Sequence, residues 1–304
     1  MGAQRVIGVD VGGTKTLAGV VGRDGEVGRT AERATPSDSQ EELLAALDDV
    51  VDEVRADGEI DAVGFGLPST IDQNAGTAVS SVHIPLAGLA FRSRMSERYA
   101  VPVAMDNDGN AAAIAEWQLG AGRGTRHMIM LTLGTGVGGG LILDGKPYRG
   151  AIGAGAELGH IVLQYGGPKC GPGCDGHGHF ETLVSGRAAD RAAQKLYGPS
   201  SSARELVDRA RDGDEAAAAA LAEVGHKLGA GIATLINIFE PELVVLGGGF
   251  AEAGDLLFDA ARETVVREAL PPGRDLVRIV PAQLGPRAGM VGAGLIAFER
   301  LERE

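Results

Sequence analysis

The residue types best suited to chemistry gather in one glycine-rich stretch, Glu157 to Gly186. It contains three of the six histidines, both cysteines and two glutamates. Thiolates and imidazole nitrogens are ligands that Zn²⁺ prefers, and carboxylate oxygens accept hydrogen bonds from neighbouring hydroxyl groups. We therefore expect this stretch to bind a small molecule and to be held in shape by a metal.

Four of these side chains have a spacing that suits a tetrahedral zinc site. Cys170 and Cys174 are separated by three residues, His179 follows after four more, and His160 stands ten residues before Cys170. Two thiolates and two imidazoles make up the four ligands of a structural zinc. His177 is a rival ligand. Two free thiols or a disulfide are the alternatives, and a reducing cytoplasm disfavours the disulfide.

Composition limits the classes of protein that this chain can belong to. Its 304 residues exceed one typical hydrophobic core, so two lobes are expected. The net charge of −13 argues against a nucleic-acid groove, because a phosphate backbone needs a basic surface. No apolar run approaches the length of a membrane helix, and residues 1–5 lead into an apolar run without the features of a signal peptide. We expect a cytoplasmic protein with neither a membrane nor a nucleic-acid partner.

The N-terminal region predicts a β-hairpin with polar residues at its tip. Apolar runs at Arg5–Val11 and Leu17–Val21 flank residues 12–16, which read GGTKT, and Asp10 stands near the end of the first run. The segment is not a P-loop, because the G-x-x-x-x-G-K-[ST] pattern is missing and no helix follows.

A similar order of elements begins again near Met128. A strand at His127–Leu133 is followed by the glycine run 134–140 and by a second apolar run, Leu141–Leu143. The glycine run contains the letters of the dinucleotide-binding fingerprint, but the helix that should follow is missing, so we reject that interpretation. A glycine hairpin after an apolar strand in each half predicts two similar lobes that face a common cleft.

A polar turn, Asp106–Asn110, follows a short strand at Val101–Met105 and precedes a helix expected to begin at Ala111. Ligands commonly bind in α/β proteins where a strand ends and a helix starts. A carboxylate there can accept the proton of a hydroxyl group during phosphoryl transfer, and Asp108 is the candidate. The alternative is that Asp106 and Asp108 compete to cap the helix, and both interpretations can hold together.

The rest of the chain is predicted to alternate helices with short buried strands. Helices are expected at Glu41–Val54, Asp214–Phe239 (one helix or two in tandem), about Ala251–Glu268 and Gly289–Leu301, and strands at Ile60–Leu67, Leu243–Leu246 and Val277–Val280. The last helix has a face of small residues that could pack at a dimer interface.

Five motifs, in this order, resemble the ROK family (repressors, open reading frames and kinases) of the actin-like, hexokinase-like superfamily. They are VDVGGTKT at Val9–Thr16, DNDGNAA at Asp106–Ala112, LTLGTGVGGG at Leu131–Gly140, the Cys/His cluster between AELGH and ETLVSG, and VVLGGG at Val244–Gly249. The resemblance covers nearly the whole chain. It implies an α/β, two-lobed actin-like, hexokinase-like (ribonuclease H-like) ATPase fold with a cleft between the lobes. The small lobe would comprise residues 1–106 with about 290–304, and the large lobe, which carries the zinc loop, residues 107–289.

The resemblance also implies which residues bind and phosphorylate a sugar. Asp108 would be the general base, and the sugar would be bound by polar side chains from several segments: Ser69, Asn107, Glu157, His160 and Glu181. Zinc would be structural, held by His160, Cys170, Cys174 and His179. Two points stay open, namely whether His160 contacts zinc, the sugar or both, and whether His177 replaces His179.

ATP and Mg²⁺ are the implied cofactors. Backbone N–H groups of glycine loops bind phosphate without a net positive charge. The phosphates would contact Gly12, Gly13, Thr14, Lys15, Thr135 and Gly136, the adenosine side would contact Gly247, Gly248 and Gly249, and Asp10 would hold Mg²⁺ through water. The adenosine-side loop favours ATP as the donor, with ADP and polyphosphate as alternatives.

Some residues depart from the family pattern. Asp106 stands where the family more often has Glu, Gly66–Ser69 replaces a common G-x-P-G loop, and Val82–Pro85 replaces an Asn-containing segment. The usual pattern has three zinc-binding cysteines, and His179 stands where the third would be. These differences leave the preferred hexose open.

The expected function is an ATP-dependent hexose kinase, a glucokinase that phosphorylates the 6-hydroxyl of glucose. N-acetylmannosamine, fructose, mannose or allose could replace glucose, and a non-catalytic sugar-sensing regulator is the alternative from another class. Repressors of the family carry an N-terminal winged-helix domain, whereas here the first phosphate strand begins by Arg5. The expected assembly is a homodimer or homotetramer.

Overall fold

Two five-stranded sheets with the same strand arrangement form the framework of the chain. The computed structural model describes residues 4–56, 58–81 and 84–303. The first sheet has the order β3-β2-β1-β4-β7, with β1 Val6–Val11, β2 Lys15–Val21, β3 Val27–Ala34, β4 Ala62–Leu67 and β7 Val103–Asn107. β2 is antiparallel to both of its neighbours, while β4 and β7 run parallel to β1 and to each other.

The second sheet repeats this arrangement and confirms the predicted duplication. Its order is β10-β9-β8-β11-β12, with β8 Met128–Leu133, β9 Val137–Leu143, β10 Lys146–Pro147, β11 Leu243–Gly247 and β12 Arg278–Pro281. Again the first three strands are antiparallel and the last two are parallel to β8. The fingerprint-like glycine run leads from β8 into β9, which confirms that no dinucleotide-binding helix follows it.

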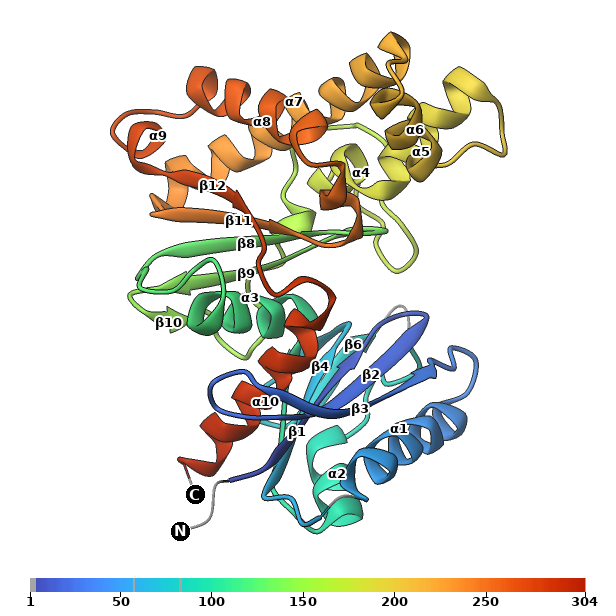
Figure 1. Cartoon of the computed structure of the whole chain (residues 1–304), viewed down its shortest axis with the longest axis vertical. Helices are drawn as coiled ribbons and strands as arrows, with labels where there is room; N and C mark the ends of the chain where they lie inside the picture. Colours follow the sequence, from blue (N-terminus) through green and yellow to red (C-terminus); the bar gives the residue numbers. More distant parts are fainter. Residues whose placement is uncertain (1–3, 57, 82–83, 304) are drawn as a thin grey trace.

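Two helices lie between the sheets, and the others cover the outer faces (Figure 1). The inner pair is α3 (Asp108–Leu119) and α10 (Ala288–Leu301). α1 (Gln40–Arg55) and α2 (Phe91–Tyr99) pack on the first sheet, and α7 (Glu215–Phe239) and α8 (Asp255–Glu268) on the second. The remaining elements are β5 Ser69–Asp72, β6 Thr77–Ser81, α4 Phe180–Val184, α5 Gly186–Tyr197, α6 Ala203–Arg211, α9 Gly273–Leu276 and 3-10 turns at Leu158–His160, Gly249–Ala253 and Gly285–Arg287.

The alternation of side chains along each strand explains these layers. In β8, Ile129 and Leu131 belong to the core under α7 and α8, whereas Met128 and Met130 belong to the core around α3 and α10. Successive residues of a strand point to opposite faces, so a strand with apolar residues on both faces must be covered twice. The inner helices therefore complete both sheets at once.

The small-residue face of α10 packs inside the chain. A Cβ added at Gly64 of β4 would lie 1.8 Å from the carbonyl oxygen of Ala293, so backbone meets backbone there. Residues 288–298 of α10 are all buried within the chain. The interpretation of this helix as a dimer-interface element is therefore wrong, because the first sheet uses the same close-packing surface.

Several predicted boundaries moved for local reasons. α3 begins at Asp108, three residues earlier than expected, because Asn107 provides the cap. β9 begins at Val137, because glycines of the predicted loop pair with β8. The run 251–268 is interrupted at Gly254, whose φ of 61° is unfavourable for other residues and ends a 3-10 turn before α8. Asp214–Phe239 forms one helix, capped by Asp214.

In the part of the chain that the structure describes, no helix is long and apolar enough to cross a membrane. Two predictions rest partly on residues that lie outside the described ones. The absence of a signal peptide depends on residues 1–3, and one departure from the family pattern depends on the pair Val82–His83. The lobe boundary at residues 106 and 107 stays a prediction.

Candidate active site

The turn between β7 and α3 is capped by an asparagine. Oδ1 of Asn107 accepts hydrogen bonds from the N–H groups of Gly109 at 2.9 Å and Asn110 at 3.3 Å. The suggestion that Asp106 and Asp108 compete as caps is therefore wrong. Asp108 is the first residue of the helix, so its carboxylate is free of the capping role apart from a 2.9 Å bond from the N–H of Gly109.

The Asp108 carboxylate sits in an environment that favours its neutral form. Burial raises its pKa from 3.8 to about 7, and the negative charges of Asp10 and Glu157 add to the shift. The N–H of Gly109 opposes it. A carboxyl group with a pKa near 7 can take up and release a proton at physiological pH, which is the property of a general base.

The first glycine hairpin brings Asp10 to the same place. A Cβ at Gly66 would lie 3.6 Å from Cα of Asp108 and 3.8 Å from Oδ1 of Asp10, so the two aspartates flank the end of β4. Burial raises the pKa of Asp10 to about 6, and the charge of Lys15 lowers it. A Cβ at Gly289 would lie 2.5 Å from Cγ of Asp10, which places the start of α10 against this carboxylate.

The tip of the first hairpin is open to solvent. The N–H of Gly12 donates to the carbonyl of Lys15 at 2.9 Å, and Gly13 and Thr14 are exposed. Nζ of Lys15 forms an exposed ion pair with Glu32 at 3.1 Å. The N–H groups of Gly13 and Thr14 and the hydroxyl of Thr14 are the donors that the hairpin tip offers to an anion.

The second glycine hairpin is tied to the segment that carries the Cys/His cluster. The N–H of Gly186, at the start of α5, donates to the carbonyl of Gly134 at 2.8 Å. The N–H of Val137 donates to Oε2 of Glu181 at 3.4 Å, and a Cβ at Gly136 would lie 2.4 Å from that oxygen. Thr135 is exposed at the tip. Glycine at 136 is thus needed for Glu181 to approach the loop.

Three of the predicted sugar-binding side chains interact electrostatically. Partial burial raises the pKa of Glu157, His160 opposes the shift, and the charge of Glu181 adds to it. Since Glu157 also raises the pKa of Asp108, these groups form one continuous cluster with the candidate base. The structure therefore brings together residues from the first hairpin, the β7–α3 turn and the Cys/His segment.

The other two predicted sugar ligands, Ser69 and Asn107, lie beside each other. Nδ2 of Asn107 donates to the backbone carbonyl of Ser69 at 3.4 Å. The hydroxyl of Ser69, a residue that is 5% exposed, donates to the hydroxyl of Ser81 at 2.8 Å. Ser69 is thus built into the β5–β6 hairpin next to the turn between β7 and α3.

The four predicted metal ligands converge. One donor atom from each of His160, Cys170, Cys174 and His179 lies within 4.8 Å of the other three. Nδ1 of His160 is 3.1 Å from Nδ1 of His179, and Sγ of Cys174 is 3.5 Å from Nδ1 of His179. Two sulfur and two nitrogen donors at these separations fit a closed tetrahedral zinc site. His177 is not part of this group.

The Cys/His cluster is also linked to the carboxylate of Glu181, a predicted sugar ligand. Sγ of Cys170 donates to Oε1 of Glu181 at 3.0 Å, while Oε2 of Glu181 accepts from the second hairpin. Because Nδ1 of His160 faces the cluster, its Nε2 is the nitrogen left for other partners. The cluster therefore positions His160 and Glu181 without leaving a ligand position open.

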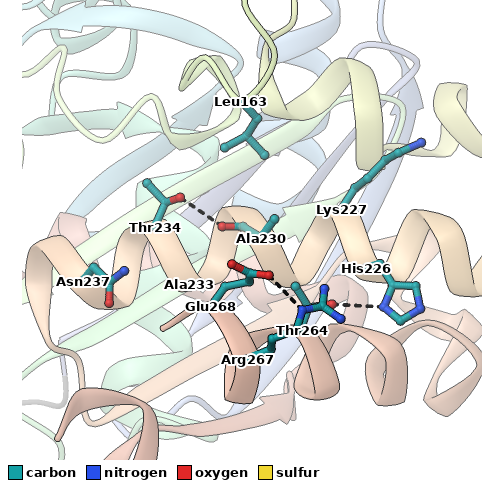
Figure 2. Close-up of a pocket in the computed structure, with 10 residues that line it drawn as sticks. All are labelled: Leu163, His226, Lys227, Ala230, Ala233, Thr234, Asn237, Thr264, Arg267 and Glu268. Carbon is teal, nitrogen blue, oxygen red and sulfur yellow. Dashed lines mark hydrogen bonds and ion pairs between the residues drawn. The ribbon is translucent and has the colours of Figure 1, made fainter. Parts of the chain in front are cut away.

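Gly247–Gly249 form the turn after β11. Gly248 has a φ of 88°, and a Cβ there would lie 2.4 Å from the carbonyl of Leu133 at the end of β8. Gly248 and Gly249 are exposed. They lie at the same end of the sheet as the second hairpin, because β11 and β8 are parallel. A surface groove of about 440 Å³ between α7 and α8 contains none of the predicted site residues (Figure 2).

One residue of this region escaped the sequence analysis. Arg149 donates from Nε to Oδ2 of the fully buried Asp106 at 2.5 Å and contacts Glu299 through Nη2 at 3.3 Å. The buried aspartate needs a counter-ion, but no local pattern identifies Arg149 as that partner, because the two residues are 43 positions apart in the chain.

Known proteins are similar to this chain in sequence and architecture. The model of the ROK family matches residues 6–300. The glucokinase of Streptomyces coelicolor is 34% identical over 96% of this chain and 97% of its own, and that of Thermotoga maritima is 34% identical over 98% of both. Among solved structures, a ROK family glucokinase from Streptomyces griseus in complex with glucose and AMPPNP has a TM-score of 0.86 and 34% identity, with 97% of this chain and 99% of that chain covered.

Proposed function

The chain belongs to the ROK family, and from this we propose that it is an ATP-dependent glucokinase whose general base is Asp108. Its two lobes form the actin-like, hexokinase-like fold, and the protein is a sugar kinase. The single observation that carries the role of Asp108 is the proximity of its carboxylate to two others with different proposed roles. Asp10 belongs to the phosphate-type hairpin and Glu157 to the sugar-side segment, and both act on the pKa of Asp108.

The chemistry follows from this position. The ionised Asp108 accepts the proton of the sugar 6-hydroxyl while that oxygen attacks the γ-phosphorus of ATP. The bond between the γ-phosphorus and the bridging oxygen breaks, and ADP leaves with the electron pair. Phosphoryl transfer requires positioning and charge stabilisation more than covalent chemistry by the protein, so the residues around the base mainly hold the two substrates in line.

The nucleotide is assigned to the three glycine loops. The phosphates contact the hairpin tip at Gly12, Gly13, Thr14 and Lys15 and the second tip at Thr135–Gly136, and Gly247–Gly249 contact the adenosine side. Asp10 would hold Mg²⁺ through water, and a bound Mg²⁺ would supply neutralisation of the phosphate charge.

The sugar is assigned to the polar groups on the other side of the base. Carboxylates of Glu157 and Glu181 accept hydrogen bonds from neighbouring hydroxyls, and the amide of Asn107 donates. Nε2 of His160 contacts the sugar, while its Nδ1 would be the zinc ligand. Ser69 contributes at the edge of the site. Zinc supplies no reacting group, and when bound it fixes the loop that carries His160 and Glu181.

We extend the proposal to surroundings and partners. Reduced thiols at Cys170 and Cys174 and the use of ATP suit the cytoplasm. The partners are glucose and ATP and further copies of the same chain, as a homodimer or homotetramer, without nucleic acid. Another hexose, another phosphate donor, or a sugar-sensing regulator without catalysis remain the competing functions.

One coupled assay separates these possibilities. The purified protein is offered glucose, N-acetylmannosamine, N-acetylglucosamine, fructose, mannose and allose, each with ATP, ADP or polyphosphate. We expect turnover with glucose and ATP, and its loss in Asp108→Ala with fold and zinc content retained. Wild-type turnover in that variant would overturn the role of Asp108, and sugar binding without turnover in the wild type would favour a regulator.

A further inference from the structure

We propose that Arg149 is a positioning residue for phosphoryl transfer, which holds the catalytic turn through the buried carboxylate of Asp106. The proposal rests on the proposed function, because it takes Asp108 as the base. Arg149 belongs to the loop after β10, and Asp106 to the end of β7, so the pair joins the two sheets.

Asp106 is the centre of the arrangement. It is fully buried, and its Oδ1 accepts from the N–H of Asn107 at 2.8 Å and from Nδ2 of Asn110 at 3.0 Å. Its Oδ2 accepts from Nε of Arg149 at 2.5 Å. Oδ1 of Asp106 therefore holds the turn between β7 and α3, and Oδ2 is paired with the guanidinium of Arg149. A buried carboxylate without a partner is strongly unfavourable, so the geometry at Oδ1 depends on the charge at Oδ2.

The connection from this pair to the base is short. Asp106 fixes the backbone of Asn107, whose side chain caps α3, and Asp108 is the first residue of that helix. A change in the Asp106 side chain is transmitted to the base through one hydrogen bond and one peptide unit. Small displacements matter here, because the base must meet the sugar hydroxyl within hydrogen-bond distance.

Arg149 also fixes the segment that leads to the sugar-side carboxylate. The loop runs from Arg149 to Glu157, and the N–H of Gly155 donates to the carbonyl of Arg149 at 2.9 Å. Midway, the carbonyl of Ile152 accepts from the N–H of Gln73 at 2.6 Å, which attaches the loop to the β5–β6 hairpin. Arg149 thus helps to position both Asp108 and Glu157, the first through Asp106 and the second through the loop that begins at Arg149.

Arg149 also contacts α10, one of the two helices between the sheets, through its Nη2 atom. Nη2 lies 3.3 Å from Oε2 of Glu299 on α10, the helix whose first turn faces Asp10. The Arg149 side chain is 18% exposed, and its Nε and Nη2 both contact protein carboxylates. This geometry distinguishes a positioning residue from one that contacts substrate.

The test is a double-mutant cycle with steady-state kinetics. Arg149→Met, Asp106→Asn and the double variant are compared with the wild type, with Arg149→Lys as the conservative change. Arg98→Met is the matched control, since Arg98 also bridges two carboxylates, Asp48 at 2.9 Å and Asp52 at 2.8 Å, but on the surface of α1 and α2. Circular dichroism and zinc content verify the fold.

We expect Arg149→Met to lower kcat with glucose by about 100-fold, the scale of effect that a small misplacement of reacting groups produces. The KM for ATP should stay unchanged, Arg149→Lys should recover part of the rate, and Arg98→Met should behave as the wild type. The double variant should be no slower than the slower single variant, because both substitutions break the same link.

Two results would overturn the inference. One is a wild-type kcat in Arg149→Met, even with a lowered melting temperature, because the residue would then be structural only. The other is a double variant whose loss is the product of the two single losses, because Arg149 would then act independently of Asp106. If Arg149→Met does not fold, Arg149→Lys and the double variant, which leaves no unpaired buried charge, carry the same comparison. A wild type that fails to phosphorylate glucose counts instead against the proposed function.

Discussion

The side chain of Asn107 caps the helix whose first residue is Asp108. Its Oδ1 accepts hydrogen bonds from the N–H groups of Gly109 and Asn110. The Asp108 carboxylate therefore lies at the N-terminus of the helix without serving as its cap. The candidate base and the residue that orients it are therefore adjacent in sequence. The amide nitrogen of Asn107 points the other way, toward the carbonyl of Ser69 at 3.4 Å.

This division of roles predicts different outcomes for two substitutions of Asn107. Asn107→Ala removes the cap and should cost about 1 kcal/mol of stability, whereas Asn107→Ser retains a capping oxygen and most of the stability. Both lack the amide donor, so both should raise the KM for glucose. Urea unfolding and steady-state kinetics measure the two effects. A wild-type KM in Asn107→Ser would remove the amide from the list of sugar contacts.

The pKa of Asp108 predicts the pH dependence of the reaction. The base must be ionised to accept a proton, and its pKa in the free protein is about 7. The value of kcat/KM for glucose should therefore fall as pH drops through about 7, with ATP and Mg²⁺ saturating. The measurement is kcat/KM across pH values on both sides of 7. A profile that stays flat down to the ordinary pKa of an aspartate would contradict the assignment.

The raised pKa of Asp108 also predicts that its ionised carboxylate lowers the free energy of unfolding of the protein. Below pH 3.8 the carboxyl is protonated in the folded and the unfolded chain, so Asp108→Asn should change little. Between pH 3.8 and about 7 the unfolded wild type ionises while the folded carboxyl stays protonated, so the wild type loses stability across this range and the variant does not. The variant should then be more stable, by up to about 4 kcal/mol above pH 7. Urea unfolding at acidic and alkaline pH measures this, with Asp49→Asn, an exposed residue of α1, as the control.

The zinc site gives a prediction that separates structure from catalysis. Mass spectrometry of the native protein should find one zinc per chain, and Cys174→Ser should lose it, whereas His177→Ala should retain it because His177 lies outside the donor group. Loss of zinc should raise the KM for glucose much more than the KM for ATP, since the cluster positions His160 and Glu181. Equal changes in both KM values would indicate general unfolding of the lobe instead.

Residue types and local spacing were enough to identify the parts of the site. The hairpin around residues 12–16, the strand before Asp106 and the two Cys/His pairs depend on short-range patterns, and the structure shows all three. The zinc ligands could be predicted because their separation along the chain is small and their chemistry is narrow. The duplication could be predicted because hydrophobic period and glycine turns repeat in the same order.

Contacts between distant segments could not be predicted in this way. Asp106 and Arg149 are 43 residues apart, and nothing in either local pattern indicates the partner. The small-residue face of α10 suits a dimer interface as well as it suits the first sheet, and only folding shows that β4 occupies it. The identity of the cap was also undetermined, because Asp106, Asn107 and Asp108 are all good capping residues.

The sequence by itself therefore determined the candidate chemical groups of this protein: a carboxylate proposed to accept the proton, glycine loops proposed to bind phosphate, and sulfur and nitrogen donors proposed to bind zinc. The tertiary structure alone decided how these groups act on one another. Burial and the neighbouring charges of Asp10 and Glu157 bring the pKa of Asp108 to about 7. Those charges come from segments that are distant in the chain, so the property that suits Asp108 to act as a base exists only in the folded state.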